Sequence, residues 1–219
     1  MLSERLAMIL CLIEPCNHLV DIGSDHGYLA LAAFQKGLVK DIIATDLRPQ
    51  PLIQSQKTFA QANVFEHVSY VLSDGLKEVT TSVDCAVIAG MGADLIIKII
   101  TQDLDKFKKM SQIITQANTR IPFLRKTLGA LGFVMDQEKI VFDGFFYIAQ
   151  SYHYTGNIYQ LNEFNEQYGN ILNRQDPITI NYLKSEEAKL KLILENNPSS
   201  KKHHHLLSLL KRRLDESSD

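Results

Sequence analysis

Short apolar runs alternate with amphipathic stretches along the first 131 residues. Several of the runs end at an acidic residue or a glycine, which is typical of buried parallel strands. The stretches between them place apolar residues at helical spacing. We expect strands at 18–22, 40–45, 68–72, 85–89 and 113–116, and helices at 3–13, 28–35, 49–62, 94–100 and 122–131. Such alternation predicts a parallel sheet covered by helices on both faces.

The pattern changes after residue 131. Two strand-like stretches, 133–141 and 145–154, lie on either side of Asp143-Gly144, a dipeptide that favours a hairpin turn. They predict an antiparallel hairpin that completes an otherwise parallel sheet. We therefore expect an α/β, Rossmann-like domain with a mostly parallel seven-stranded sheet over residues 1–156.

The last part of the chain has a different composition. From residue 158 onward glycine becomes rare, and Asn, Glu, Lys and Leu dominate. The leucine spacing predicts helices at 178–195 and 206–214, and a short connection favours their antiparallel packing. We expect residues 157–219 to form a small, coiled-coil-like helical appendage.

Composition narrows the classes of function. The net charge of −2 means that any site for a polyanion must be a local basic patch. Three cysteines without metal-ligand spacing favour a reduced chain with no metal site, and adjacent histidines at 203–205 would point in different directions on a helix. The N-terminal apolar stretch is too short to span a bilayer. We expect a cytoplasmic protein that does not enter a membrane.

Glycines and acids follow four of the predicted strands. Asp21-Ile-Gly-Ser-Asp-His-Gly27 follows the first strand, Asp46 ends the second, Asp74-Gly75 follows the third, and Gly90-Met91-Gly92 follows the fourth. Ligands of open parallel sheets bind at the carboxyl ends of the strands. Glycines let the backbone approach a ligand closely. These four groups are therefore predicted to line one crevice.

The acids indicate the kind of ligand. Asp46 is placed to accept hydrogen bonds from ribose hydroxyls, and Asp74 can accept one from the amine of an adenine. Asp21 and Asp25 put negative charge at the first turn, which would repel a pyrophosphate and attract a sulfonium with an ammonium group. The G-x-G-x-x-G pattern of dinucleotide sites is absent, which argues against an NAD oxidoreductase. The crevice thus favours S-adenosylmethionine.

Three motifs resemble one known family. They are Asp-Ile-Gly-Ser-Asp-His-Gly-Tyr-Leu at 21–29, Asp-Gly-Leu at 74–76 and Ala-Gly-Met-Gly at 89–92, and they look like those of the TrmK-type tRNA (adenine-N1)-methyltransferases. The order and spacing hold over residues 1–155, and the helical tail is similar in kind. The resemblance implies a bacterial class I methyltransferase that uses S-adenosylmethionine to methylate N1 of adenine 22 in tRNA.

The resemblance also implies cofactor contacts. They carry over to Asp21, Gly23, Asp25, His26, Asp46, Asp74, Gly75 and Gly90, and we add the neighbouring Gly27, Leu47 and Met91. The chain departs from the family at three places. It has Gln116-Ala117-Asn118 where Gln-Pro-Asn is usual, Ala93-Asp94 where a further glycine is usual, and Asp46 where glutamate is usual.

The chemistry of N1 methylation selects candidates for catalysis. N1 of adenine already carries an in-plane lone pair, so the protein must chiefly align it with the methyl group. A carboxylate or amide oxygen would stabilise the positive charge that develops on the ring. We predict Asp25, Gln116 and Asn118 as catalytic residues, and His26 could orient the base. N1 is hidden in a base pair, so the target must be extruded or already unpaired.

RNA binding requires a local positive surface. We predict that Arg120, Arg125 and Lys126 flank the target pocket, and that Lys201 and Lys202 of the tail grip tRNA by shape. A monomer or weak homodimer is expected. Two alternatives stay open, a methyltransferase of small molecules and a non-catalytic nucleotide-binding or scaffold protein.

Overall fold

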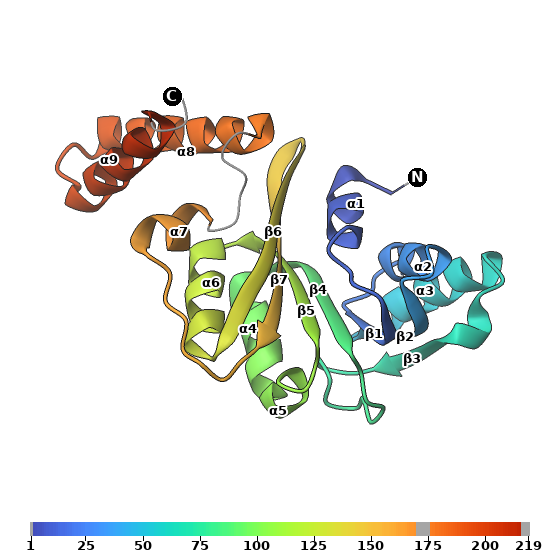
Figure 1. The fold of residues 1–219 in the computed structure, drawn as a ribbon. Helices are drawn as coiled ribbons and strands as arrows, with labels where there is room; N and C mark the ends of the chain where they lie inside the picture. The colour runs from blue at the N-terminus through green and yellow to red at the C-terminus, as the bar shows by residue number, and fades with distance from the viewer. Residues whose placement is uncertain (1, 170–175, 216–219) are drawn as a thin grey trace.

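The computed structural model describes residues 2–169 and 176–215 of the 219-residue chain. Within these ranges seven strands form one sheet in the order β3-β2-β1-β4-β5-β7-β6 (Figure 1). Strands β1 to β5 are parallel, and β7 pairs antiparallel with both β5 and β6. The predicted mostly parallel sheet with a terminal antiparallel hairpin is confirmed. The strands are β1 (Cys16–Ile22), β2 (Val39–Asp46), β3 (Val68–Leu72), β4 (Cys85–Gly92), β5 (Gln112–Thr119), β6 (Phe133–Asp143) and β7 (Phe145–Tyr154).

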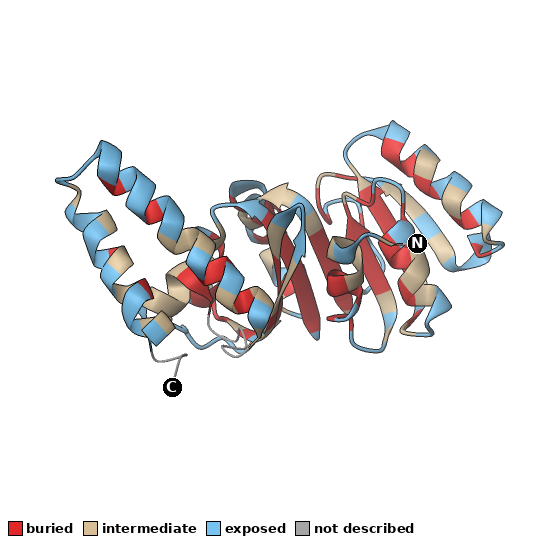
Figure 2. Cartoon of the chain, turned by 90° about the horizontal axis from the view of Figure 1, so that it is seen from above, coloured by how far each residue is buried: buried red, intermediate tan, exposed pale blue. Residues whose placement is uncertain are grey.

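Helices cover both faces of the sheet. One face carries α1 (Glu4–Leu10), α2 (Tyr28–Gln35) and α3 (Pro49–Gln61), and the other carries α4 (Ala93–Gln102), α5 (Leu104–Phe107) and α6 (Ile121–Ala130). Alternate residues of β1 serve the two sides, since Leu19 packs with the first group of helices and Val20 with the second. Figure 2 shows the strands buried between these layers. The sheet is thus held rigidly, and its carboxyl edge stays open.

The C-terminal helices pack beyond the hairpin edge of the sheet. They are α7 (Glu163–Tyr168), α8 (Pro177–Asn196) and α9 (Lys201–Asp215). Leu190 of α8 and Leu210 of α9 join a third apolar cluster with Ile148 of β7. The ring of Phe146 meets that of Tyr182 edge-on at 5.6 Å between centroids. The two predicted tail helices are present, while a domain division between residues 156 and 157 stays a prediction.

Element ends differ from the sequence prediction where tertiary contacts act. The first helix ends at Leu10 rather than at residue 13, because the N–H groups of Leu12 and Ile13 donate to carbonyls three residues back instead of four. Strand β5 continues to Thr119 because it pairs with the irregular end of β4, Met91 with Ala117 and Gly92 with Thr119. The short helices α5 and α7 and the 3₁₀ turn η1 (Phe65–His67) are too brief to produce a readable period.

The described ranges contain neither a membrane-spanning helix nor a cluster of metal ligands. No helix within 2–169 and 176–215 combines the length and the hydropathy needed to cross a bilayer. In the same ranges, no group of three or more His, Cys, Asp or Glu side chains is arranged to hold a metal ion.

Candidate active site

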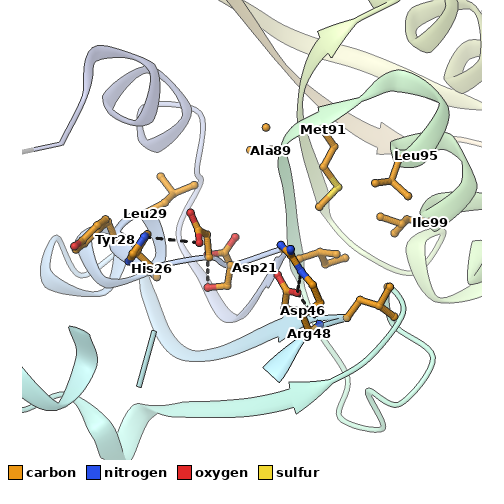
Figure 3. A pocket seen from close by; sticks show the side chains of 18 of the residues that line it. Asp21, His26, Tyr28, Leu29, Asp46, Arg48, Ala89, Met91, Leu95 and Ile99 are labelled. Atoms are coloured by element: carbon orange, nitrogen blue, oxygen red, sulfur yellow. Dashed lines mark hydrogen bonds and ion pairs between the residues drawn. The ribbon is translucent and has the colours of Figure 1, made fainter. Parts of the chain in front are cut away.

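A pocket of about 740 Å³ opens at the carboxyl ends of the parallel strands (Figure 3). Its lining comes from the ends of β1, β2 and β4 and the segments after β1, β2 and β3, with additions from α1, α2, α4, β5 and β7. The structure brings together every residue that the sequence predicted for the cofactor. These are Asp21, Gly23, Asp25, His26, Gly27, Asp46, Leu47, Asp74, Gly75, Gly90 and Met91.

The turn after β1 needs residues that tolerate left-handed backbone. Gly23 has φ +76° and Gly27 has φ +71°. A Cβ on Gly23 would lie 2.3 Å from Cε of Met91, and one on Gly27 would lie 2.5 Å from Oγ of Ser55. Glycine is therefore favoured at both positions for conformation, and at Gly27 also for space, because Cε2 of the buried Phe59 would lie 2.8 Å from the added Cβ. The close approach lets the backbone of this turn form part of the pocket wall.

Asp21 places a carboxyl group at the base of the pocket. The residue is 7% exposed, and one carboxylate oxygen accepts a hydrogen bond of 2.9 Å from Oγ of Ser24. Burial raises the pKa of Asp21 to about 6, the Ser24 hydrogen bond opposes that rise, and the nearby charge of Asp25 adds to it. Asp21 is consequently mostly ionised at neutral pH and contributes a poorly hydrated negative charge.

Asp46 and Asp74 supply two further carboxylates. Oδ1 of Asp46 accepts a hydrogen bond of 2.8 Å from the backbone N–H of Arg48, which fixes the carboxylate at the end of β2. Oδ2 of Asp74 accepts one of 3.3 Å from Nζ of Lys98. In Figure 3, Asp21 and Asp46 lie between His26 on one side and Met91 on the other. The carboxylates therefore face a shared space.

Apolar side chains close the other side of the pocket. Met91, Leu95 and Ile99 line it from the end of β4 and from α4. On the opposite side the rings of His26 and Tyr28 are stacked, with centroids 5.4 Å apart. Carboxylates beside an apolar wall suit a ligand that joins hydroxyl and cationic groups to a flat ring.

An amide network extends from the pocket into the sheet. Oε1 of Gln116 accepts hydrogen bonds from Nη1 of Arg5 at 2.9 Å and from the N–H of Gly90 at 3.1 Å. Nε2 of Gln116 donates to Oδ1 of Asn118 at 3.0 Å, and Nδ2 of Asn118 donates to the carbonyl of Gly90 at 2.8 Å. Because Arg5 and the Gly90 N–H can only donate, the orientation of both amides is fixed. Asn118 therefore presents its amide to the pocket in one orientation.

Two of the three predicted catalytic residues line the pocket, and one does not. Asn118 and Asp25 are lining residues, and the Asp25 side chain is 76% exposed. Gln116 has no exposed surface, and its amide atoms already bond to Arg5, Gly90 and Asn118. The prediction that Gln116 is catalytic is therefore wrong, because a buried and fully engaged amide cannot touch a substrate. Gln116 instead orients Asn118.

The predicted RNA-binding residues separate into exposed and buried ones. Arg125 is 2% exposed and forms an ion pair with Glu138, Nη2 to Oε1, at 2.6 Å. The prediction that Arg125 binds RNA is wrong, because its guanidinium is enclosed by protein. Arg120 is paired with Asp94, and its guanidinium carbon lies 4.3 Å from the centre of the Phe123 ring.

Lys126 lies 3.5 Å from a carboxylate oxygen of Glu166, and Lys201 and Lys202 are exposed at the start of α9. None of Arg120, Arg125 and Lys126 lines this pocket, and the prediction that Arg120 and Lys126 flank the place of the target base stays a prediction. A role for Arg120, Lys126, Lys201 and Lys202 in binding RNA stays a prediction.

Sequence reasoning missed Arg5 and Tyr147. Both line the pocket, and the Arg5 guanidinium carbon lies 5.7 Å from the centre of the Tyr147 ring. They come from α1 and β7, far from the motifs in sequence, and nothing in their local pattern marks them. For Tyr147 the predicted hairpin was the available signal. Antiparallel pairing of β7 with β5 brings the start of β7 to the edge of the sheet where β5 ends.

Comparisons with known proteins agree with this geometry. The family described as methyltransferase domain matches residues 2–149. A tRNA (adenine(22)-N(1))-methyltransferase of Bacillus subtilis is 30% identical over 128 residues, which cover 58% of this chain and 54% of the relative. The chain thus spans about half the length of that curated relative.

Two solved structures resemble the whole described fold. One is a proposed tRNA (m1A22) methyltransferase of Streptococcus pneumoniae in complex with S-adenosyl-L-methionine. It is 27% identical with a TM-score of 0.88, and the match covers 98% of this chain and 100% of that chain. The other is TrmK of M. capricolum in complex with S-adenosyl-homocysteine, with 25% identity, a TM-score of 0.83, and coverage of 100% of this chain and 98% of that chain.

Proposed function

The chain belongs to the methyltransferase-domain family, and from that premise we propose that it transfers the methyl group of S-adenosylmethionine to N1 of adenine 22 in tRNA. The observation that carries the proposal is the pocket, in which carboxylates at the ends of β1, β2 and β3 face an apolar wall. Similarity to the S. pneumoniae and M. capricolum structures over 98% and 100% of this chain supports the choice of tRNA. The protein would act in the cytoplasm as a monomer or weak homodimer.

The pocket fits the cofactor by its donor and acceptor chemistry. Asp46 would accept from the ribose hydroxyls, Asp74 from the adenine amine, and Asp21 with Asp25 would face the cationic end. Leu47, Gly75, Gly90 and Met91 would complete the contact surface. When bound, S-adenosylmethionine supplies an electrophilic methyl group on a sulfonium.

The residues of this chain would position the target base. Asn118 is held by Gln116 and Gly90, so it can contact the base without reorganising, and fixed polar groups of this kind lower the barrier as charge develops. Asp25, exposed at the rim, would stabilise the positive charge on the methylated ring. The lone pair on N1 needs no general base.

One assay separates this proposal from its rivals. Purified protein is incubated with labelled S-adenosylmethionine and unmodified tRNA, and the modified nucleoside is mapped. Label in 1-methyladenosine at position 22 is the expected result. Methylation of a metabolite with tRNA unlabelled would indicate a small-molecule methyltransferase. Binding of the donor or of nucleotides without any transfer would indicate a scaffold protein.

Cofactor affinity should depend on the ionisation of Asp21. The pKa of Asp21 in the folded chain is raised to about 6, so the unliganded fold favours the protonated carboxyl. The stability gained from protonation is complete at a pH below the ordinary pKa of an aspartate, and it is lost as the pH rises through about 6. A cationic ligand prefers the ionised form. We expect the affinity for S-adenosylmethionine, measured by calorimetry, to be about tenfold weaker at pH 5 than at pH 7.

Asp21→Asn is the control for this pH dependence. The variant cannot ionise, so its affinity should be weak and nearly constant between pH 5 and pH 7. An unchanged pH profile in Asp21→Asn would assign the titration to another group.

The tail lysines should contribute a salt-dependent part of tRNA affinity. Each phosphate contact releases counterions, so losing one reduces the slope of log K against log salt by about 0.7–0.9. We expect the double variant Lys201→Ala/Lys202→Ala to bind tRNA more weakly and with a shallower slope in filter-binding titrations. The exposed Lys40 at the amino-terminal end of β2 supplies the control Lys40→Ala, which should match the wild type. Equal slopes for all three proteins would refute a phosphate contact by the tail lysines.

A further inference from the structure

The tip of the β6–β7 hairpin presents two aromatic side chains to solvent. Phe142 is 55% exposed and Phe145 is 74% exposed, and they flank the Asp143-Gly144 turn. Figure 1 shows this hairpin reaching beyond the ends of the neighbouring strands, and Figure 2 shows its tip exposed. Phe145 and Phe142 are thus candidates for contact with a ligand of this region, and the neighbours of each ring decide between them.

The two faces of the hairpin have different surroundings. Phe142 lies opposite Phe146 in the register, their ring centroids are 5.0 Å apart, and Phe146 in turn meets Tyr182 of α8. Side chains alternate along a strand, so Phe145 shares the other face with Tyr147. Tyr147 lines the pocket beside Arg5. Phe145 is therefore on the pocket side of the hairpin.

The position of Phe145 follows from strand pairing. Gln116 of β5 lies opposite Ala149 of β7 in an antiparallel pair. Two residues further along each strand are Asn118 and Tyr147, which both line the pocket. Phe145 is two residues beyond Tyr147, about 7 Å at the usual strand rise. That distance is about two steps of a nucleotide stack at ~3.4 Å each.

We propose that Phe145 stacks on a base next to the target nucleotide and fills the stack when the adenine leaves it for the pocket. This inference rests on the proposed function, because it requires an RNA base in the pocket. The aromatic ring offers a flat apolar surface that any base can stack on. Asp143 at the same tip would repel a phosphate, so the hairpin approaches bases and not the backbone.

A tryptophan probe tests the stacking directly. The chain has no tryptophan, so Phe145→Trp introduces a single fluorophore at the tip. Stacking on a base should quench its emission when unmodified tRNA is added. Phe65→Trp is the matched control, since Phe65 is 59% exposed but lies in η1, which leads into the amino-terminal end of β3. Quenching in Phe145→Trp alone supports the proposal, and equal signals at both positions overturn it.

A kinetic comparison tests the consequence for catalysis. Phe145→Ala should lower kcat/KM for tRNA by about tenfold or more, because stacking on one base contributes on that order. Its affinity for S-adenosylmethionine by calorimetry should stay within twofold of wild type, and Phe145→Tyr should keep most activity. Phe65→Ala should behave as wild type.

Two further outcomes separate the possible failures. If the wild type transfers no methyl group to tRNA, the proposed function fails, and quenching of the Phe145→Trp probe alone then decides whether the tip stacks on RNA. If Phe145→Ala converts a dimer into a monomer in sedimentation and leaves kcat/KM unchanged, the tip binds a second copy of the chain and the proposal is wrong.

Discussion

Replacing Arg125 with alanine is expected to destabilise the fold by about 3–5 kcal/mol, the usual cost of removing one partner of a buried ion pair. The side chains of Arg125 and Glu138 are 1% and 0% exposed. Oε1 of Glu138 accepts from Nε of Arg125 at 2.8 Å, from Nη2 at 2.6 Å, and from Nε2 of Gln150 at 2.8 Å. The variant would leave a carboxylate enclosed by protein without its cation. Equilibrium unfolding in urea measures the loss.

The neighbouring Lys126 provides the control. Its amine is 3.5 Å from Glu166 and its side chain is 66% exposed, so Lys126→Ala should change the free energy of unfolding by less than about 1 kcal/mol. The double variant Arg125→Met/Glu138→Gln removes both charges and keeps an acceptor for Gln150. It should recover part of the stability. If Arg125→Ala unfolds at the same urea concentration as the wild type, the ion pair does not stabilise the fold.

Arg125 also ties α7 to the sheet. Its Nη1 donates to the backbone carbonyls of Glu166 and Gln167 at 3.0 and 3.2 Å, which are the last turn of α7. Loss of the guanidinium should therefore loosen α7 as well as the interior. In the sequence, an arginine beside a lysine on a short helix indicates a solvent-exposed charge. Its partner Glu138 lies thirteen residues later in β6, so the ion pair can be recognised only from the fold.

The strands were predictable because burial dictates their composition locally. The predicted bounds of β3 and β7 coincide with the observed ones. Asp143-Gly144 precedes β7 and Gly156 follows it, and Asp74-Gly75 follows β3. The end of β5 was not predictable. Ala117, Asn118 and Thr119 look like loop residues, and they are held in the strand by the irregular end of β4.

The cofactor side of the pocket was predictable for a related reason. Parallel strands bring their carboxyl ends to the same edge of a sheet, so the prediction of a parallel sheet was enough to bring the four motifs to one edge. The target side depends on contacts across more than a hundred residues, such as Arg5 with Gln116. No local pattern encodes such a pair, and the assignment of Gln116 to catalysis failed because burial and partners are tertiary properties.

Asn118→Ala is expected to lower kcat for tRNA methylation by about a hundredfold. In the proposed mechanism the amide of Asn118 aligns the target base, and a misplacement of about 1 Å in such a reaction can cost that much. The amide is already oriented by Gln116 and Gly90, so its loss removes a fixed contact that the transition state uses. The affinity for S-adenosylmethionine should stay within about threefold, because the cofactor contacts are assigned to other residues. Steady-state kinetics with saturating donor and calorimetry measure the two quantities.

The split between kcat and KM decides what Asn118 does. Asn157 is exposed in the segment after β7, and Asn157→Ala controls for the general effect of removing a surface amide. A fall in kcat with KM nearly constant means that the contact strengthens in the transition state. A rise in KM with kcat within threefold of wild type would contradict the alignment role, because Asn118 would then bind the RNA equally in the ground state and the transition state. Gln116 also accepts hydrogen bonds from Arg5 and from the Gly90 N–H, so only the part of its effect that passes through Asn118 should disappear in the Asn118→Ala background. Gln116→Leu should therefore lower kcat less when it is added to Asn118→Ala than when it is made alone.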